Sequence, residues 1–458
     1  MPELSKIGEG DKVFAYSKSL NNYGFVSVEN LKSKGYACRR WNVNHSSPVG
    51  EVYGNIDYLR ELPGLLGLGC YLVDNARNMR KLSPTNHYKF ADGSAASIDG
   101  SMGDYMWCWA TPFYYSWWRE GDYYYEAVAL TPIEGRQNYY IPVGGISALG
   151  SGVIDRTNDK LVSVVNNAAQ YRGGNNDSTR DNTYKTLLGR VASNYNITEF
   201  RRLARNKGEG WEAGWFVHNA VVGILTRLIL GTRHIQSAFN SSKDANGLYQ
   251  GGLGNGVTVD GSKWDQNFNY YPFLPTSAGV ELADGVGVSN QIVQDASGNT
   301  LFTVGVPVFF GLKNFYAYIG CIEGGSLISK RADGSGDYYV ANSLYTGYTV
   351  NGTSGMTKAT TIPANNPMGW KYITEISMQN LCHAPTVAEG SSSTYYADGY
   401  YNDNAVSGLR VPFRRGDASH GGACGPECLI ANHAVSSASA SWSSPLCFTK
   451  EDIAPFPC

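Results

Sequence analysis

The stretch DGSMGDYMWCWATPFYYSWWREGDYYYEAVALTPIEG, residues 99–135, is the aromatic centre of the chain. Aromatic residues favour strands, and the REGD sequence at 119–122 predicts the turn that joins two of them as a β-hairpin. Aromatic side chains contribute most of the apolar area of a loop-rich core, and they also pair across strands. We therefore interpret these side chains as core residues rather than as a binding surface.

Helices are predicted only on the C-terminal side of this hairpin, within residues 161–231. Thr198 precedes an acidic and basic segment at 199–205 and suits a helix N-cap. Apolar residues recur at three- and four-residue spacing over 212–230, and Gly231 follows as a C-cap. The long Leu59–Leu72 segment contains Pro63 and three glycines, so we do not expect one continuous helix there. Short strands are expected elsewhere, at 13–16, 23–28, 301–310, 315–322 and 372–378, with few helices after 240.

Composition excludes several classes of protein. The 458 residues carry 37 Lys+Arg against 39 Asp+Glu, a net charge of −2, which disfavours nucleic acid as a partner. The N-terminus MPELSKIGEGDK has neither the basic nor the apolar region of a secretory signal, and no run approaches the length of a membrane span. We expect synthesis in a cytosol and no membrane insertion. Nine cysteines without a CxxC pair predict free thiols rather than a disulfide framework.

Three segments of the chain resemble a known family. The helix GILTRLILGTRHIQSAFN (223–240) is similar to a helix that ends in a Gly-Thr-x-x-x-Gln-Ser signature, and GDYMWCWATPFYYSWW (103–118) is similar to a strand of the same proteins. The C-terminal RRGDASHGGACGPECLIANHAVSSASASWSSPLCF resembles their variable region. The family is the variable proteins of diversity-generating retroelements, which includes the tropism determinants of phages. Arg415-Gly416-Asp417 replaces the usual Gly-Gly, and the chain runs past the usual end.

The resemblance implies an α+β fold with a C-type-lectin-like core of the formylglycine-generating-enzyme type and long irregular loops. It implies a small β-rich N-terminal unit for attachment or oligomerisation, residues 1–90, and a ligand-binding domain, residues 91–458. That domain would carry an insertion around 241–365 and a variable tract around 416–447.

The composition of the tract is consistent with this interpretation. Residues 416–447 contain six Ala, seven Ser, four Gly and three Cys, without Lys or Arg. Mutation of template adenines turns an Asn codon into any of fifteen residue types, and 417–447 fit those types except at Glu427 and Trp442. An ordinary Ser/Ala/Gly-rich loop remains the alternative.

The function implied is that of a phage tail receptor-binding protein that sits on the virion, at the tail tip or fibre, and displays a diversified surface to bacterial cell-surface proteins or glycans. Other tail proteins and two further copies, in a homotrimer, are the implied partners. We expect the tract to be exposed, and tyrosines near it to add contact area. The expected ligand-binding residues are Asp417, Ser419, His420, Ala423, Cys424, Glu427, Ala431, His433, Ser436, Ala438, Ala440, Trp442, Tyr395 and Tyr396.

The alternative is a structural or enzymatic protein of the same fold without diversification. A formylglycine-generating activity would require reactive thiols, for which Cys424 and Cys428 are the candidates, but no Lys or Arg lies in the tract to activate them. Asp398 and Asp403 could form the carboxylate pair of a glycosidase, although such residues in Tyr/Asn/Gly-rich loops usually make turns. Zinc on Cys424, Cys428, His420 and His433 has irregular spacing, and no spaced calcium loop is present. We therefore predict no catalytic residue, no cofactor and no metal.

Overall fold

The computed structural model describes residues 35–171, 173, 189–239, 274–294, 300–345, 348–417, 420–439 and 441–458, together with strands at 12–17 and 22–27. Strands account for 38% of residues and helices for 14%, so the protein belongs to the mostly-β class. The predicted α+β class is wrong, and the sheets of the described residues do not identify a C-type-lectin-like core. The fold consists mainly of paired β-strands, and helices do not alternate regularly with the strands along the chain.

The aromatic stretch forms the predicted hairpin within a five-stranded sheet. Its two strands pair from Glu120 and Tyr123 onward, and Gly121 supplies the positive φ of 57° that the turn requires. The strand order is β11 (Tyr139–Ile141), β9 (Phe113–Glu120), β10 (Tyr123–Ala129), β3 (Ala37–Asn42) and β4 (Glu51–Val52).

A seven-stranded sheet brings a strand near the C-terminus, at 446–449, together with strands from residues 69–147 and 211–213. Its order is β15 (Trp211–Ala213), β31 (Leu446–Thr449), β12 (Gly144–Ser147), β8 (Asp104–Trp109), β5 (Gly69–Val73), β6 (Met79–Ser83) and β7 (Asn86–Phe90). Trp107 and Trp109 of β8 are fully buried, as the interpretation of the aromatics as core requires. β3 pairs with β10 and β5 pairs with β8, so strands from residues 37–73 share sheets with strands from residues 104–129. The hairpin β1 (Lys12–Ser17) and β2 (Asn22–Ser27) forms a separate two-stranded sheet.

The predicted insertion and variable tract also supply strands to shared sheets. A six-stranded sheet has the order β23 (Gly369–Tyr372), β26 (Gly399–Asn402), β29 (Gly425–Ile430), β28 (Phe413–Arg415), β19 (Gly320–Ile322) and β30 (Trp442–Ser443). A four-stranded sheet has the order β22 (Met356–Ile362), β21 (Gly336–Ala341), β20 (Ser326–Lys330) and β27 (Gly408–Arg410). Strands from 320–362 and from 408–443 thus build the same two sheets, so neither segment is an appendage.

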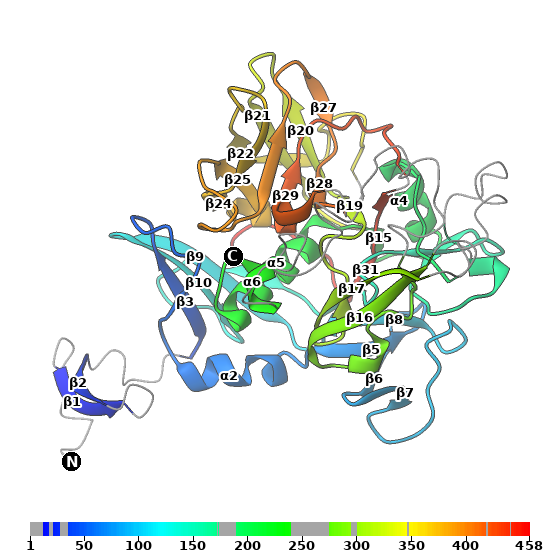
Figure 1. The fold of residues 1–458 in the computed structure, drawn as a ribbon, viewed down its shortest axis with the longest axis horizontal. Helices are drawn as coiled ribbons and strands as arrows, with labels where there is room; N and C mark the ends of the chain where they lie inside the picture. Colours follow the sequence, from blue (N-terminus) through cyan, green and yellow to red (C-terminus); the bar gives the residue numbers. More distant parts are fainter. Residues whose placement is uncertain are drawn as a thin grey trace.

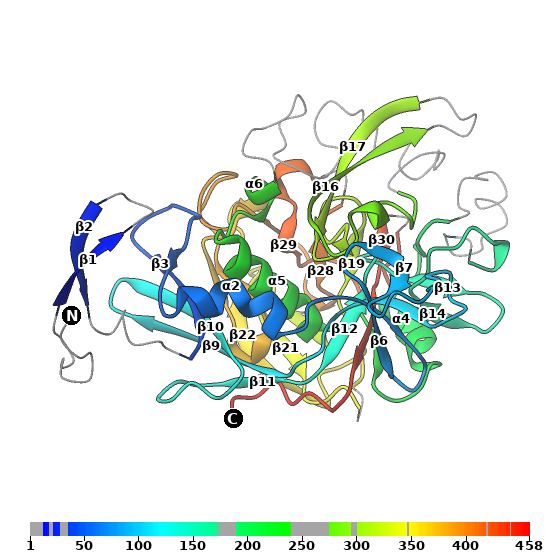
Figure 2. The same cartoon turned by 90° about the horizontal axis from the view of Figure 1, so that it is seen from below.

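Three smaller sheets complete the strand inventory of the described residues. They are β13 (Val153–Asp155) with β14 (Lys160–Val162), β16 (Val286–Gln294) with β17 (Thr300–Phe309) and β18 (Leu312–Lys313), and β24 (Glu375–Ser377) with β25 (Ala384–Val387). The β16–β17 hairpin projects from the body of the molecule (Figure 2). The strand expected at 301–310 is therefore present, whereas of 315–322 only the last three residues pair.

Four α-helices occur among the described residues. They are α2 (Ile56–Leu65), α4 (Ile197–Arg205), α5 (Phe216–Leu230) and α6 (Ile235–Phe239), and short 3-10 turns are η2 (Ala169–Tyr171), η4 (Val280–Leu282), η5 (Gln379–Leu381) and η6 (Gly421–Ala423). The N-cap of α4 is Asn196 rather than the predicted Thr198, because Asn196 and Glu199 form a reciprocal capping box. None of these helices is long and apolar enough to cross a membrane.

Helix α5 lies in the centre of the molecule (Figure 1), where it packs on α2, β3, β10 and β29. Every residue from Phe216 to Leu228 is buried, so the helix is enclosed on all sides, whereas apolar residues at three- and four-residue spacing alone indicate one buried face. Gly231 ends it in the left-handed conformation, as expected, and Arg39 Nε donates to the carbonyl of Leu228 at 2.6 Å. The residues that follow this cap lead directly into the candidate site.

Candidate functional site

The structure places most of the predicted ligand-binding tract inside the protein. Ser436 and Ala438 are exposed, and His420 and His433 are half-buried. Ser419 and Ala440 lie outside the described residues. The buried members of the predicted set are Asp417, Ala423, Cys424, Glu427, Ala431 and Trp442. The expectation that the tract is exposed throughout is therefore wrong for these six.

The tract is buried because β29 occupies an interior position in its sheet. It pairs with β26 on one edge and with β28 on the other, and its residues Gly425–Ile430 are all buried. On one side β29 also packs against α5. Gln236 in α6 fixes the preceding turn by donating to the carbonyl of Cys424 at 2.6 Å, which gives a structural role to part of the Gly-Thr-x-x-x-Gln-Ser signature.

The tract cysteines are unsuited to nucleophilic chemistry. Cys424 and Cys428 are both fully buried, and burial raises the pKa of each thiol well above its usual range. A nucleophilic cysteine needs a thiolate that a substrate can reach. These two thiols meet neither condition.

Glu427 belongs to a buried network of charges. Its carboxylate contacts Arg227 Nη1 of α5 and lies 3.0 Å from His383 Nδ1. Arg227 also pairs with Glu126 of β10 at 3.0 Å. Burial acts to raise the pKa of Glu427, but Arg227 and His383 outweigh it and hold that pKa below the usual value. The network joins α5, β10 and β29 and leaves Glu427 no free oxygen for an external ligand.

Tyr395 and Tyr396 line a surface pocket of about 290 Å³. Tyr396 is buried and Tyr395 is half-buried. The other lining side chains are aromatic (Trp117, Tyr124), hydroxyl-bearing (Thr360, Thr374, Ser377, Thr386), charged (Arg119, Arg233, Glu375) or aliphatic (Val43, Ile376). This mixture of aromatic walls and convergent polar groups is typical of small-molecule sites. The pocket is our candidate binding site.

Of the lining residues, only Tyr395 and Tyr396 were predicted to bind a ligand, and the most informative of the others is Arg233. It lies in the turn between α5 and α6, and its side chain is surrounded by aromatic rings, with the guanidinium carbon 4.6 Å from the ring centre of Trp41, 5.0 Å from Tyr124 and 4.8 Å from Tyr396. The residue is only 6% exposed, and its Nε has no hydrogen-bond partner among the described residues. In the sequence, the only indication was a single arginine two residues after the C-cap Gly231 of an apolar helix, in GTRHIQS (231–237).

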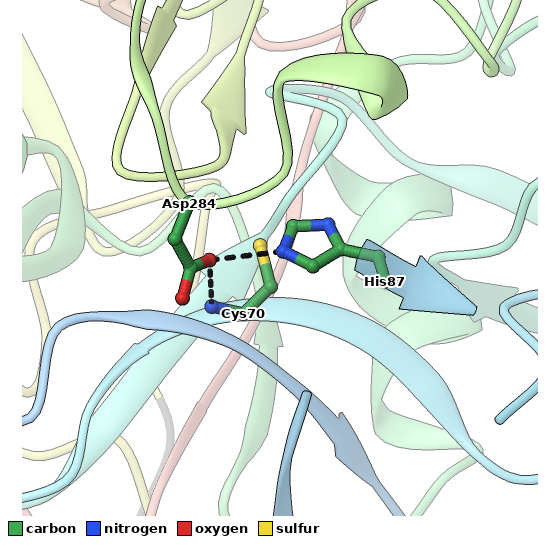
Figure 3. Close-up of side chains that lie close together, drawn as sticks. All are labelled: Cys70, His87 and Asp284. Carbon is green, nitrogen blue, oxygen red and sulfur yellow. Dashed lines mark hydrogen bonds and ion pairs between the residues drawn. The ribbon is translucent and has the colours of Figure 1, made fainter. Parts of the chain in front are cut away.

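A second cluster brings together Cys70, His87 and Asp284, whose ligand atoms lie within 4.8 Å of one another (Figure 3). Asp284 Oδ1 accepts from the backbone N–H of Cys70 at 2.9 Å and lies 3.0 Å from His87 Nε2. His87 Nδ1 lies 2.5 Å from the hydroxyl of Tyr105, which also accepts from Lys313 Nζ at 2.6 Å. Both imidazole nitrogens therefore already have partners, and neither is free to take a proton from the thiol.

The surroundings of this cluster do not favour catalysis or a metal. Burial raises the pKa of the Cys70 thiol to about 12. A Cβ added at Gly311 would lie 2.6 Å from Cys70 Sγ, so the cluster is closely packed. The ammonium of Lys313 lies fully buried in the same cluster and opposes a second cation. We interpret the three residues as a structural polar cluster whose hydrogen bonds connect β5, β7 and the segment that follows η4.

Neither a family model nor a curated protein matches this chain. The functional conclusion therefore depends on the geometry of the pocket and on the sequence resemblance described above.

Proposed function

We propose that this chain is a receptor-binding protein of a phage tail and that it holds a bacterial cell-surface ligand in the pocket lined by Trp117, Arg233 and Tyr395. The observation that carries the proposal is the buried guanidinium of Arg233, which faces a pocket and has no acceptor for its Nε among the described residues. Buried polar groups normally have partners, so an unpartnered one in a pocket indicates a ligand.

The sequence resemblance supports the biological setting of the proposal. In that setting the virion presents several copies of the chain, as a homotrimer together with other tail proteins. Multiple copies raise the effective affinity of individually weak sites by avidity, so one small pocket per chain suffices. The exposed end of the tract, at Ser436 and Ala438, would add a surface whose side chains can change without affecting the core.

The proposal is tested by adsorption of purified protein to cells of candidate hosts. Thr386→Trp places a large ring at a half-buried wall of the pocket, and Ser436→Trp places the same ring on the exposed part of the tract. We expect Thr386→Trp to abolish adsorption and Ser436→Trp to preserve it, with unchanged circular dichroism for both. If only Ser436→Trp lost adsorption, the receptor site would have to lie in the tract instead of the pocket. If the wild type and both variants failed to adsorb to any host, the proposal would be rejected.

A further inference from the structure

Arg233 has an unusual electrostatic environment for a buried cation. Among the described residues, no ion pair of Arg233 with a carboxylate is found, and its buried Nε has no hydrogen-bond partner. The three surrounding rings stabilise the positive charge through their faces, but a ring face does not replace the in-plane acceptors that five N–H groups require. A buried N–H group without an acceptor is destabilising. An anion bound in the pocket would supply them.

The charges around the pocket limit the ligand to a small negative charge. Arg119 is exposed at the pocket and has no ion pair within the described part of the chain, whereas Glu375 is exposed and negative. Two cations and one carboxylate leave an excess of one positive charge. A ligand with a single carboxylate balances this excess, and the planar fork of an arginine binds a carboxylate through two parallel hydrogen bonds.

The remaining walls fit a sugar ring better than a peptide or a lipid chain. Trp117 and Tyr395 offer half-buried aromatic faces against which the C–H groups of a pyranose pack. Thr360, Thr386 and Glu375 offer oxygen atoms for its hydroxyl groups. The volume of about 290 Å³ lies at the lower end of the ~300–1,000 Å³ of small-molecule sites, enough for a short saccharide.

We infer that the pocket binds a carboxylated saccharide, of the uronic-acid type, with its carboxylate on the guanidinium of Arg233 and its ring against Trp117. This inference rests on the proposed receptor-binding function and names the chemical class of its ligand. The acid and its methyl ester differ only in the charge that Arg233 would recognise, so they provide the decisive comparison.

The experiment measures binding of the full chain to a uronic-acid oligosaccharide, to its methyl ester and to a sugar phosphate by calorimetry. We expect the acid to bind at least about tenfold more tightly than the ester, the difference that one charge-assisted hydrogen-bond pair produces. Arg233→Gln should reduce the ratio of the two affinities to about one, Arg233→Lys should restore part of it, and Arg119→Gln, at the exposed rim, should leave most of it.

Each outcome separates the inference from the proposed function. Equal affinity of acid and ester for the wild type, or preference for the sugar phosphate, would overturn the carboxylate assignment, while pocket-dependent adsorption to cells would still support receptor binding. Where Arg233→Gln does not fold, the acid-to-ester ratio of the wild type decides alone. Loss of that ratio with Arg119→Gln but not with Arg233→Gln would also overturn the inference.

Discussion

His383 Nδ1 lies 3.0 Å from a carboxylate oxygen of Glu427, in the interior of the protein. The other ring nitrogen, Nε2, lies 3.0 Å from Glu323, which Arg414 also contacts at 3.2 Å. The His383 ring therefore bridges the carboxylates of Glu427 and Glu323, and Arg227 and Arg414 contact the same two carboxylates. A residue predicted to contact the ligand thus completes a buried network instead.

The first prediction concerns the stability that Glu427 provides. Glu427→Gln preserves the shape of the side chain but leaves Arg227 and His383 each without one anionic partner. We expect the free energy of unfolding to fall by about 3 kcal/mol, as for other broken buried ion pairs. Urea denaturation measures the change, and Ser436→Ala, at an exposed position, is the control expected to stay within about 0.5 kcal/mol. Equal effects of the two substitutions on the free energy of unfolding would contradict the role of Glu427 in the buried network.

The second prediction concerns pH and Asp398. This carboxyl is buried next to β29, where its Oδ2 accepts from the backbone N–H of Glu427 at 2.8 Å and its Oδ1 has no partner. Burial raises its pKa well above the usual value, and the charge of Glu427 adds to the rise. A raised folded-state pKa gives stability that is fully present below the unfolded pKa of about 3.9 and is lost as the pH rises toward the folded pKa.

Asp398→Asn removes this titration and keeps an oxygen for the same backbone N–H. We therefore expect the melting temperature of the variant to rise relative to that of the wild type between about pH 4 and pH 7. The comparison depends only on how the difference changes with pH, so a constant offset caused by the amide does not matter. A difference that stayed flat over this range would show that Asp398 is ionised in the folded protein.

The third prediction concerns two residues of helix α5. From the repeat of apolar residues alone, Leu225 and Ile229 appear equivalent, but Leu225 is fully buried and Ile229 is half-buried near the end of the helix. Leu225→Asp should abolish folding, because a buried unpaired charge costs many kcal/mol unless it is neutralised. Ile229→Asp should yield a folded protein of reduced stability. Soluble expression and far-ultraviolet circular dichroism distinguish the two, and two folded variants of similar stability would contradict this placement of the helix.

Features that depend on residues close together in the chain could be predicted from the sequence, whereas features that depend on distant residues could not. The hairpin of β9 and β10 and the end of α5 at Gly231 follow from turn and cap residues close together in the chain. The sheets depend on distant pairs, such as Ile146 with Cys447, which no local pattern reveals. For this reason the fold class was wrong although several of its elements were right.

Some residues of the candidate site could likewise be predicted from the sequence, and others could not. Tyr395 and Tyr396 were selected for their aromatic contact area, and they do line the pocket. The alanines and serines of the tract were expected to be exposed because the resemblance implies a diversified display surface, but a small residue such as Ala431 also suits a closely packed strand end. Arg233 could not be selected because its significance lies in three rings contributed by distant segments.

The last prediction concerns which tract positions tolerate change. A diversified site must separate side-chain choice from stability, and exposed substitutions usually change stability by no more than about 0.5 kcal/mol. Ser436→Tyr and Ala438→Tyr should therefore leave the melting temperature almost unchanged. Cys424→Tyr and Ala431→Tyr insert a ring at fully buried positions and should lower stability by several kcal/mol or prevent folding. If the gene has a near-identical template repeat, its adenine-linked mismatches should fall on the codons of Ser436 and Ala438 and spare those of Cys424, Glu427 and Ala431. Mismatches concentrated at the buried positions, together with unchanged melts of the buried tyrosine variants, would mean that β29 is not part of the core.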